Sequence, residues 1–167
     1  MTDSRSGTSG ANGAQVSVRG WLHVEVVHPD PDAAARFLCD TLGGRIVERE
    51  LTASLKTLAE GLGCVHVLVS GVVFQLVRPV EGLEPWYSVL KEHGPCVHNV
   101  TFNVDGLEHA REVLEAAGAT KVADLEVPLG ALSDDDLTRV YLMDARQQAG
   151  IRIEMGDVPR WIGGEAP

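Results

Sequence analysis

Residues 21–28 read Trp-Leu-His-Val-Glu-Val-Val-His, and Asp30-Pro31 follows shortly after them. His23, Glu25 and Val27 alternate onto one face of this run, which is typical of a strand. Asp30 can cap a helix, and the proline after it fits the first helical turn. Apolar residues then recur at helical spacing as far as Gly43-Gly44, which predicts the end of the helix. A strand followed by an amphipathic helix is therefore expected.

Three further strands are expected in the first half of the chain. The dipeptide Ser70-Gly71 lies between two apolar runs and predicts a tight hairpin turn. The expected strands are residues 45–51, 64–70 and 72–77. The first half therefore has the order βαβββ.

The second half repeats this plan. Its strand is Cys96-Val-His-Asn-Val-Thr-Phe-Asn-Val104, and Asp105 with Glu108 predicts a capping box at the start of a helix that Gly118 ends. Further strands are expected near residues 120–127, 138–144 and 150–155. The first histidine and the helix-ending glycine recur in the second half at the same offset of 75 positions. Such a repeat outranks local propensity as evidence for the fold.

The predicted fold class is α+β, with two tandem βαβββ modules that form a cupped mixed sheet. The linker between the modules contains residues 85–92, which can form a short helix. The predicted organisation is a flexible N-terminal tail at 1–18, a first module at 19–80, a linker at 81–95, a second module at 96–156 and a C-terminal tail at 157–167.

Composition excludes several functional classes. The chain has 167 residues, 44% of them apolar, which suits a globular protein with its own core. A net charge of -10 with only 14 dispersed Lys and Arg residues argues against nucleic-acid binding. No apolar run approaches the ~20 residues of a membrane span and no secretory signal is evident, so we expect a cytoplasmic protein. Three cysteines without paired spacing predict neither disulfides nor a cysteine zinc site.

Each half carries a histidine in its first strand and a polar residue in its last. These residues are His23 and Gln75 in the first half, and His98 and Glu154 in the second. A polar side chain buried unpaired in an apolar strand costs several kcal/mol. If the halves pack around a pseudo-twofold axis, the four side chains converge as two nitrogen and two oxygen donors. That set suits zinc, cobalt, nickel, manganese or iron(II) rather than calcium.

The alternative is that the two histidines are ordinary hydrogen-bonded sheet residues and that the two other side chains face solvent. For any one of the four residues alone, this alternative is the better interpretation. Their equivalent places in an internal repeat favour the joint metal site instead.

Four segments carry a resemblance to a known family. They are Leu22-His23-Val24, Phe74-Gln75-Leu76, the run from Lys91 to Val104 that contains Glu-His-Gly, and Gly150-Ile-Arg-Ile-Glu154. Over about residues 20–156 the chain resembles the vicinal oxygen chelate superfamily, which includes glyoxalase I, methylmalonyl-CoA epimerase, extradiol dioxygenases and antibiotic-resistance proteins. The ligand order His, Gln, His, Glu is most similar to the epimerase branch.

The resemblance implies a metal-dependent epimerase, isomerase or lyase that transfers a proton next to a carbonyl. The substrate would be a small molecule with a carbonyl or carboxylate, such as an acyl-CoA, and the protein a homodimer. By the resemblance, an epimerase has a glutamate base on the third strand, where this chain has His66. His66 and Glu154 are therefore the candidate acid–base residues. Alternatively, His66 is a hydrogen-bonded histidine that faces away from the site.

Two other functions stay open at this point. A glyoxalase-like or dioxygenase-like metalloenzyme is one, although an iron dioxygenase uses two histidines and one carboxylate, and Gln75 as a fourth ligand argues against it. The other is a non-catalytic resistance module that binds a small molecule in the same cleft. Trp86 and Tyr87 could line the mouth of that cleft or anchor the linker, of which the anchor is the better interpretation.

Overall fold

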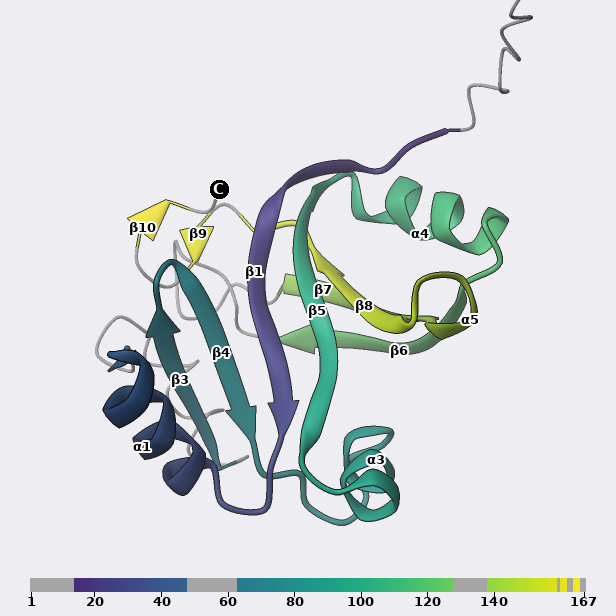
Figure 1. Cartoon of the computed structure of the whole chain (residues 1–167). Coiled ribbons are helices and arrows are strands. Elements are labelled where there is room, and N and C mark those ends of the chain that lie inside the picture. The colour runs from purple at the N-terminus through teal and green to yellow at the C-terminus, as the bar shows by residue number, and fades with distance from the viewer. Residues whose placement is uncertain (1–13, 48–62, 128–137, 159, 162–163, 166–167) are drawn as a thin grey trace, which may run out of the picture.

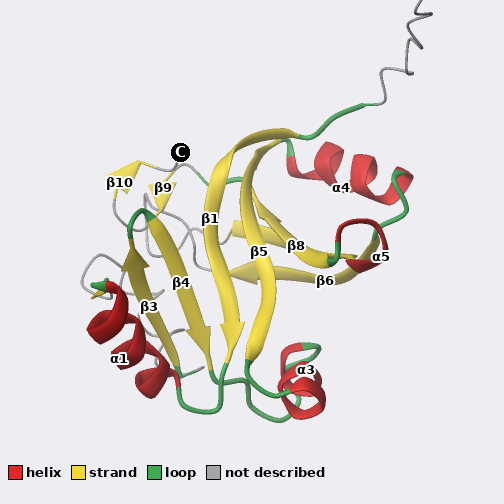
Figure 2. Ribbon diagram, in the orientation of Figure 1, coloured by secondary structure: helices red, strands yellow, loops and turns green. Residues whose placement is uncertain are grey.

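The computed structural model describes residues 14–47, 63–127, 138–158, 160–161 and 164–165. Its main feature is an eight-stranded mixed sheet that curls into a cup (Figures 1 and 2). The strand order is β2-β3-β4-β1-β5-β8-β7-β6. The predicted α+β fold of two βαβββ modules is confirmed.

The first module contains β1 (Ser17–Val27), α1 (Pro31–Leu42), β2 (Arg45–Ile46), β3 (Cys64–Val69) and β4 (Val72–Val77). The second contains β5 (Cys96–Asp105), α4 (Leu107–Ala116), β6 (Thr120–Val127), β7 (Thr138–Ala145) and β8 (Ile151–Gly156). The linker forms α3 (Trp86–His93), close to its predicted position. Three short elements were not predicted: α5 (Arg146–Ala149), β9 (Arg160–Trp161) and β10 (Gly164–Glu165).

The two modules join through their first strands. β1 pairs antiparallel with β5, and each of these strands also pairs in parallel with the last strand of its own module, β4 or β8. The centre of the sheet is therefore β4-β1-β5-β8, two strands from each module. Because hydrogen-bonded neighbours lie less than about 5 Å apart, residues at matching register on these four strands are close together.

Helix α1 begins and ends as the sequence predicts. The Asp30 carboxylate accepts a hydrogen bond of 2.9 Å from the Ala33 amide, and Gly43 ends the helix with a positive φ of 67°. The buried face of α1 packs through Ala35 against Val67 and Leu76 of the sheet. This packing assigns one face of β3 and β4 to the outer, helix-covered side.

The predicted capping box of the second helix is wrong. Helix α4 begins after Gly106 and has no side-chain cap, because β5 continues to Asp105. The Asp105 carboxylate instead accepts a hydrogen bond of 2.9 Å from the Ser17 hydroxyl and lies 3.3 Å from Arg19 Nε. A longer pairing of β5 with β1 thus takes the place of a helix cap.

The hairpin turn at Ser70-Gly71 is confirmed. The φ angles are 48° at Ser70 and 86° at Gly71, which place both residues in the left-handed region. The strand expected at residues 45–51 is described only as Arg45–Ile46, followed by Val47, whose amide donates to the His66 carbonyl at 3.0 Å. Residues 48–51 and most of the predicted N-terminal tail lie outside the described residues.

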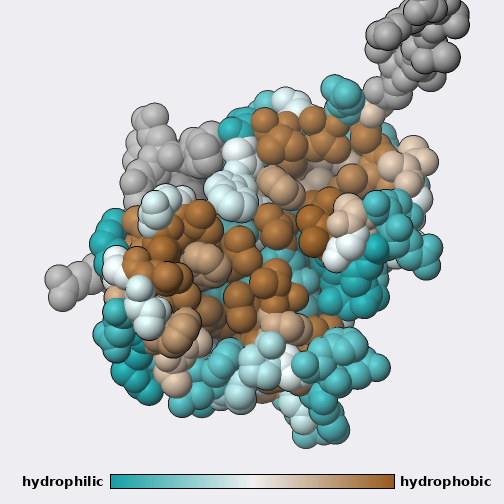
Figure 3. Space-filling model, in the orientation of Figure 1, coloured by the Kyte–Doolittle hydropathy of each residue, from teal (hydrophilic) through white to brown (hydrophobic). Residues whose placement is uncertain are grey.

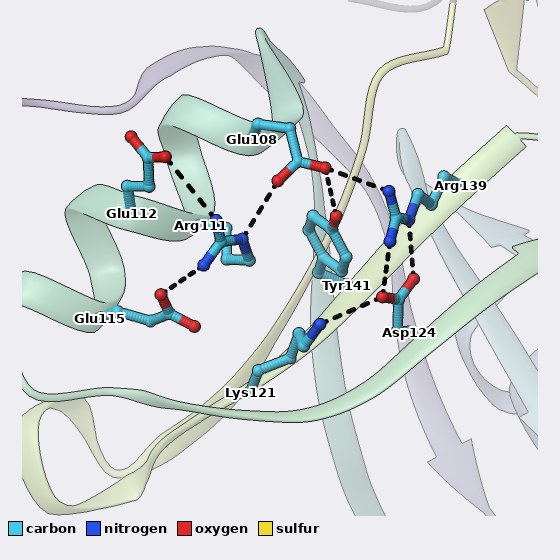
Figure 4. Close-up of polar contacts among 8 residues, drawn as sticks. All are labelled: Glu108, Arg111, Glu112, Glu115, Lys121, Asp124, Arg139 and Tyr141. Carbon is cyan, nitrogen blue, oxygen red and sulfur yellow. Dashed lines mark hydrogen bonds and ion pairs between the residues drawn. The ribbon is translucent and has the colours of Figure 1, made fainter.

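A network of ion pairs attaches α4 to the outer face of β6 and β7 (Figure 4). The Tyr141 hydroxyl donates to Glu108 of α4, and Arg139 binds both oxygens of Asp124 at 2.8 Å. Lys121 contacts the same aspartate at 3.1 Å. Since these charges are exposed to solvent, each pair contributes little to stability. Every cation in this network has a carboxylate partner.

Within the described part of the chain, no helix has both the length and the apolar character needed to cross a membrane.

The two helix starts give a matched test of capping. Asp30→Ala should lower the free energy of unfolding by about 1 kcal/mol, because it leaves the Ala33 amide without its acceptor. Asp105→Ala, at the equivalent place in the second module, should cost less, because it removes only exposed contacts. Urea unfolding of both variants measures the difference, and equal losses would contradict the assignment of these caps.

Candidate functional site

The inner face of the sheet carries a band of buried polar residues. Side chains alternate along a strand, so the residues next to those packed on α1 point to the opposite side. By this alternation His66, Gln75 and Glu25 share the inner face. Residues of the inner face of β5 and β8 complete the band. The buried members are His23, Glu25, His66, His98, Asn99, Thr101 and Glu154, while Gln75 is half-buried.

Strand register brings the predicted site residues of the two modules together. Glu25 is the register partner of Gln75 in β4 and of Asn99 in β5. Two residues earlier in β1, His23 is opposite Thr101, which in turn is opposite Glu154 of β8. A hydrogen bond of 3.0 Å from the Thr101 hydroxyl to the Asn99 side-chain oxygen joins the residues level with Glu25 to those level with His23.

His98 reaches this band through a bulge in β5. The register passes from the pair Val26 and Val97 directly to Glu25 and Asn99, so that His98 is an extra residue without a partner across the ladder. Both His98 and Asn99 consequently contact Glu25. The distances to Glu25 Oε1 are 3.1 Å from His98 Nδ1 and 2.9 Å from Asn99 Nδ2.

Trp86 closes this part of the site from α3. It is only 4% exposed, its indole N–H donates to Glu25, and its ring stacks on His98 with centroids 4.9 Å apart and 25° between the planes. Trp86 also packs with Val27 and Leu142 on the inner face. The interpretation of Trp86 as an anchor is therefore supported, and the anchor is part of the site itself.

Sequence reasoning missed Glu25, Asn99 and Thr101 as site residues. Glu25 had the same signal as Gln75 and Glu154, a polar residue within an apolar strand, and it shares the His23 face. Asn99 and Thr101 lie among apolar neighbours in β5. The sequence pattern of β5 does not show that Thr101 contacts a histidine of the other module. Thr101 Oγ1 lies 2.8 Å from His23 Nε2.

His66 lies on the same inner face as the predicted ligands. Its ring is fully buried, and its Nε2 lies 3.1 Å from Gln75 Nε2, which can donate to it. The ring also contacts Cys64 Sγ at about 4 Å. His66 is therefore hydrogen-bonded, as the alternative expected, but it lies on the inner face rather than facing away from it. Its role as an acid or base stays a prediction.

Burial shifts the protonation of every ionisable group in this band. It raises the pKa of Glu25 to about 7 and that of Glu154 well above its usual value, and the negative charge of Glu25 raises the latter further. It lowers the pKa of His66 to about 4, and those of His23 and His98 to about 3. At neutral pH the three histidines are therefore neutral and can offer lone pairs.

The imidazole nitrogens and the carboxylate and amide oxygens of this band are donor types that bind divalent metals. Among the described residues, His98 Nε2 is buried without a hydrogen-bond partner, and the negative charge of Glu25 adds to the burial that raises the pKa of Glu154. As the side chains stand, however, the described residues include no group of three His, Cys, Asp or Glu side chains that could hold a metal ion. His23 contacts Thr101 through Nε2 and His98 contacts Glu25 through Nδ1. His98 Nε2 is therefore the atom of His98 that could bind a cation.

Comparison with protein families identifies the family of this chain. A family model described as the Glyoxalase/Bleomycin resistance protein/Dioxygenase superfamily matches residues 22–137. The match spans well over half of the chain, and the chain therefore belongs to this superfamily. No curated protein matches the chain significantly.

Solved structures with the same fold include methylmalonyl-CoA epimerases. The epimerase from Mycobacterium tuberculosis is 20% identical, with a TM-score of 0.60 over 88% of this chain and 93% of the epimerase. An epimerase variant from Streptomyces coelicolor in complex with 2-nitronate-propionyl-CoA is 18% identical, with a TM-score of 0.60 over 86% and 100%. An epimerase in complex with methylmalonyl-CoA and NH4+ is 16% identical, with a TM-score of 0.61 over 90% and 100%. These likenesses confirm the predicted resemblance and the fold.

The buried histidines predict how the metal-free protein responds to acid. The pKa of His66 is lower in the folded protein than its usual 6.5, so its contribution to stability is complete above pH 6.5 and is lost as the pH falls toward 4. By pH 4 the loss from His66 alone should reach about 3 kcal/mol. Urea unfolding of the metal-free protein between pH 7.5 and pH 4 measures this loss. His66→Gln should flatten the curve, whereas His109→Gln, on exposed α4, should not; identical curves for both variants would contradict the account.

Proposed function

We propose that this protein is a divalent-metal-dependent epimerase, isomerase or lyase that moves a proton next to a carbonyl group. The observation that carries the proposal is the joint burial of two carboxylates, Glu25 and Glu154, with three neutral histidines on one inner face. A purely structural core gains nothing from this arrangement, because the charged forms are desolvated and the carboxylates repel each other. Membership of the superfamily and the epimerase-like fold support the same function.

The proposed metal ligands are His23, Gln75, His98 and Glu154. Gln75 uses its amide nitrogen on His66, which leaves its carbonyl oxygen as the atom suited to a cation. The lone pair of His98 Nε2 has no other partner among the described residues. When bound, a divalent cation acts as a Lewis acid that stabilises the negative charge of an enolate.

Glu154 and His66 are the proposed acid–base residues, one from each module. Glu154 is buried on the inner face opposite Thr101, where its carboxylate could accept a proton from a bound substrate and return it. His66 is neutral at this pH and accepts a hydrogen bond at Nε2, so it can also orient Gln75. Trp86 and Leu142 belong to the buried apolar cluster at one end of the inner face.

The proposed substrate is a small molecule with a carbonyl or carboxylate. An acyl-CoA is one candidate, because solved epimerases of this fold contain methylmalonyl-CoA or 2-nitronate-propionyl-CoA. A non-catalytic small-molecule binding protein is the second candidate function. It is favoured by the fact that no three ligating side chains converge among the described residues before any cation binds.

Proton exchange in D2O tests the enzymatic proposal. The protein loaded with cobalt or zinc should exchange the α proton of an acyl thioester, followed by NMR. Glu154→Gln should slow the exchange about 100-fold or more, because the proton-transfer group is lost. Glu126→Gln, an exposed carboxylate on β6, is the matched control and should leave the rate unchanged.

Failure of the metal-loaded protein to exchange any α proton would refute the enzymatic proposal. Tight binding of small carbonyl compounds that does not depend on metal would then support the binding protein.

We also propose that two copies of the chain pair through the outer face of the sheet. Apolar surface spreads over this face (Figure 3), including a groove of about 400 Å³ lined by Val26, Phe37, Phe74 and Leu76. A second apolar groove lies at Val18, Phe102 and Ile153. A twofold interface uses the same patch on both copies, which an uncharged apolar patch allows despite a net charge of -10.

Phe37 gives a direct test of this pairing, since it is 64% exposed at the edge of the groove. Phe37→Asp should convert a dimer into a monomer, because a desolvated charge would face its own copy across the twofold axis. Light scattering after size exclusion measures the mass. Val80→Asp, at an apolar residue that is 51% exposed and lies outside both grooves, should leave the mass unchanged. A monomeric wild-type chain, or a dimer that survives Phe37→Asp, would contradict the interface.

A further inference from the structure

Arg152 lies beside the candidate site but belongs to none of its hydrogen bonds. It precedes Glu154 by two residues in β8, so the two side chains leave the strand on the same face, about 6–7 Å apart along it. On the neighbouring strand β7, its register partner is Asp144. Arg152 is half-buried, and it is the next residue along the inner face from the proposed proton-transfer group.

Asp144, the register partner of Arg152, already forms an ion pair with another arginine. Arg146 Nε lies 3.0 Å from both oxygens of Asp144, and Arg146 Nη2 lies 2.6 Å from one of them. The Arg146 amide donates to the same carboxylate at 3.0 Å. Arg152 is left without this partner, and its Nε is buried with no hydrogen bond among the described residues.

This state of Arg152 differs from that of the cations on the outer face. Arg111, Arg139 and Lys121 each lie against at least one carboxylate (Figure 4). A buried guanidinium N–H without an acceptor is costly, and the paired N–H donors of arginine match the oxygens of a carboxylate or a phosphate.

Two arginines act on this end of the inner face. Burial and the charge of Arg146 lower the pKa of Arg152, and the charge of Asp144 opposes them. Burial lowers the pKa of His98, and both arginines lower it further. The carboxylates of Asp144 and Glu92 both act on Arg146. Of the two arginines, Arg152 is therefore the one that has a buried N–H without an acceptor among the described residues, and it is two residues from Glu154.

We propose that Arg152 is a specificity-determining residue that binds an anionic group of the substrate next to the reacting carbonyl. This inference rests on the proposed function for the identity of the reacting end. The anion is a carboxylate on the acyl group or a phosphate, both of which match the paired N–H donors of a guanidinium. Neutral carbonyl compounds leave Arg152 unpaired and are poor substrates. The Asp144–Arg146 pair keeps Arg152 available, because it prevents Asp144 from neutralising it.

Calorimetry of the metal-loaded protein with two probes tests this inference and separates the two sources of anion. Methylmalonate represents the acyl carboxylate, and inorganic phosphate represents the phosphate. At least one probe should bind the wild type, and Arg152→Gln should weaken that binding 10-fold or more, while Arg152→Lys should retain part of it. Arg36→Gln, an exposed arginine on α1, is the control and should bind as the wild type does.

Two further variants keep the test decisive if Arg152→Gln fails to fold. Arg146→Gln frees Asp144 to pair with Arg152 and should weaken anion binding, whereas Asp144→Asn should preserve or strengthen it. Unchanged binding in Arg152→Gln, opposite effects in the other two variants, or binding of neither probe to the wild type would overturn the inference.

The α-proton exchange assay distinguishes this inference from the proposed function. Anion binding that depends on Arg152, without exchange of any substrate, would refute the proposed function and leave the anion site standing. Exchange of an anionic thioester that is equally fast in Arg152→Gln would refute the anion site and leave the proposed function standing.

Discussion

The antiparallel pairing of β1 with β5 determines where the polar side chains of the inner face lie. It puts the first strands of the two modules side by side, and the parallel partners β4 and β8 follow on either side. One residue from each of four strands can then meet on one face, although the residues are far apart in the sequence. Without this pairing, each module would bury one histidine and one amide or carboxylate that face no counterpart. The site is therefore a product of the module interface rather than of either module.

Burying the carboxylate of Glu25 on the inner face costs free energy, and several neighbouring side chains reduce this cost. Glu25 accepts from Trp86 and Asn99 and contacts His98, so a single carboxylate holds together α3, β1 and β5. Such partners lower the cost of burying a charge, while desolvation still dominates and raises its pKa. A bound cation would lower this cost further, because it supplies the missing positive charge where two carboxylates repel each other.

Much of the fold could be predicted from the sequence, because the repeat and the alternation of apolar residues are local signals. Asp30, Ser70-Gly71 and the strand around His23 all behave as their sequence patterns indicate. The same alternation correctly grouped His23, Glu25 and Val27 on one buried face of β1. The expectation that polar residues of the two modules meet came from the repeat.

The remaining features depend on contacts that no local pattern contains. The bulge that turns both His98 and Asn99 toward Glu25 breaks the alternation on which the prediction relied. Asp105 matches a helix cap in sequence, but pairing with β1 took it into the strand instead. Trp86 is separated from Glu25 by 61 positions, and only the position of α3 brings its indole N–H to the carboxylate. Ligation by the four predicted donors stays a prediction of the same kind, since it depends on how side chains respond to a cation.

The most direct test of the shared site is anomalous scattering at the cobalt absorption edge from crystals of the cobalt-loaded protein. The account predicts one cobalt peak per chain, contacted by donors from β1 and β4 of the first module and from β5 and β8 of the second. A protein that takes up no cobalt, or a peak held by donors of one module alone, would contradict it.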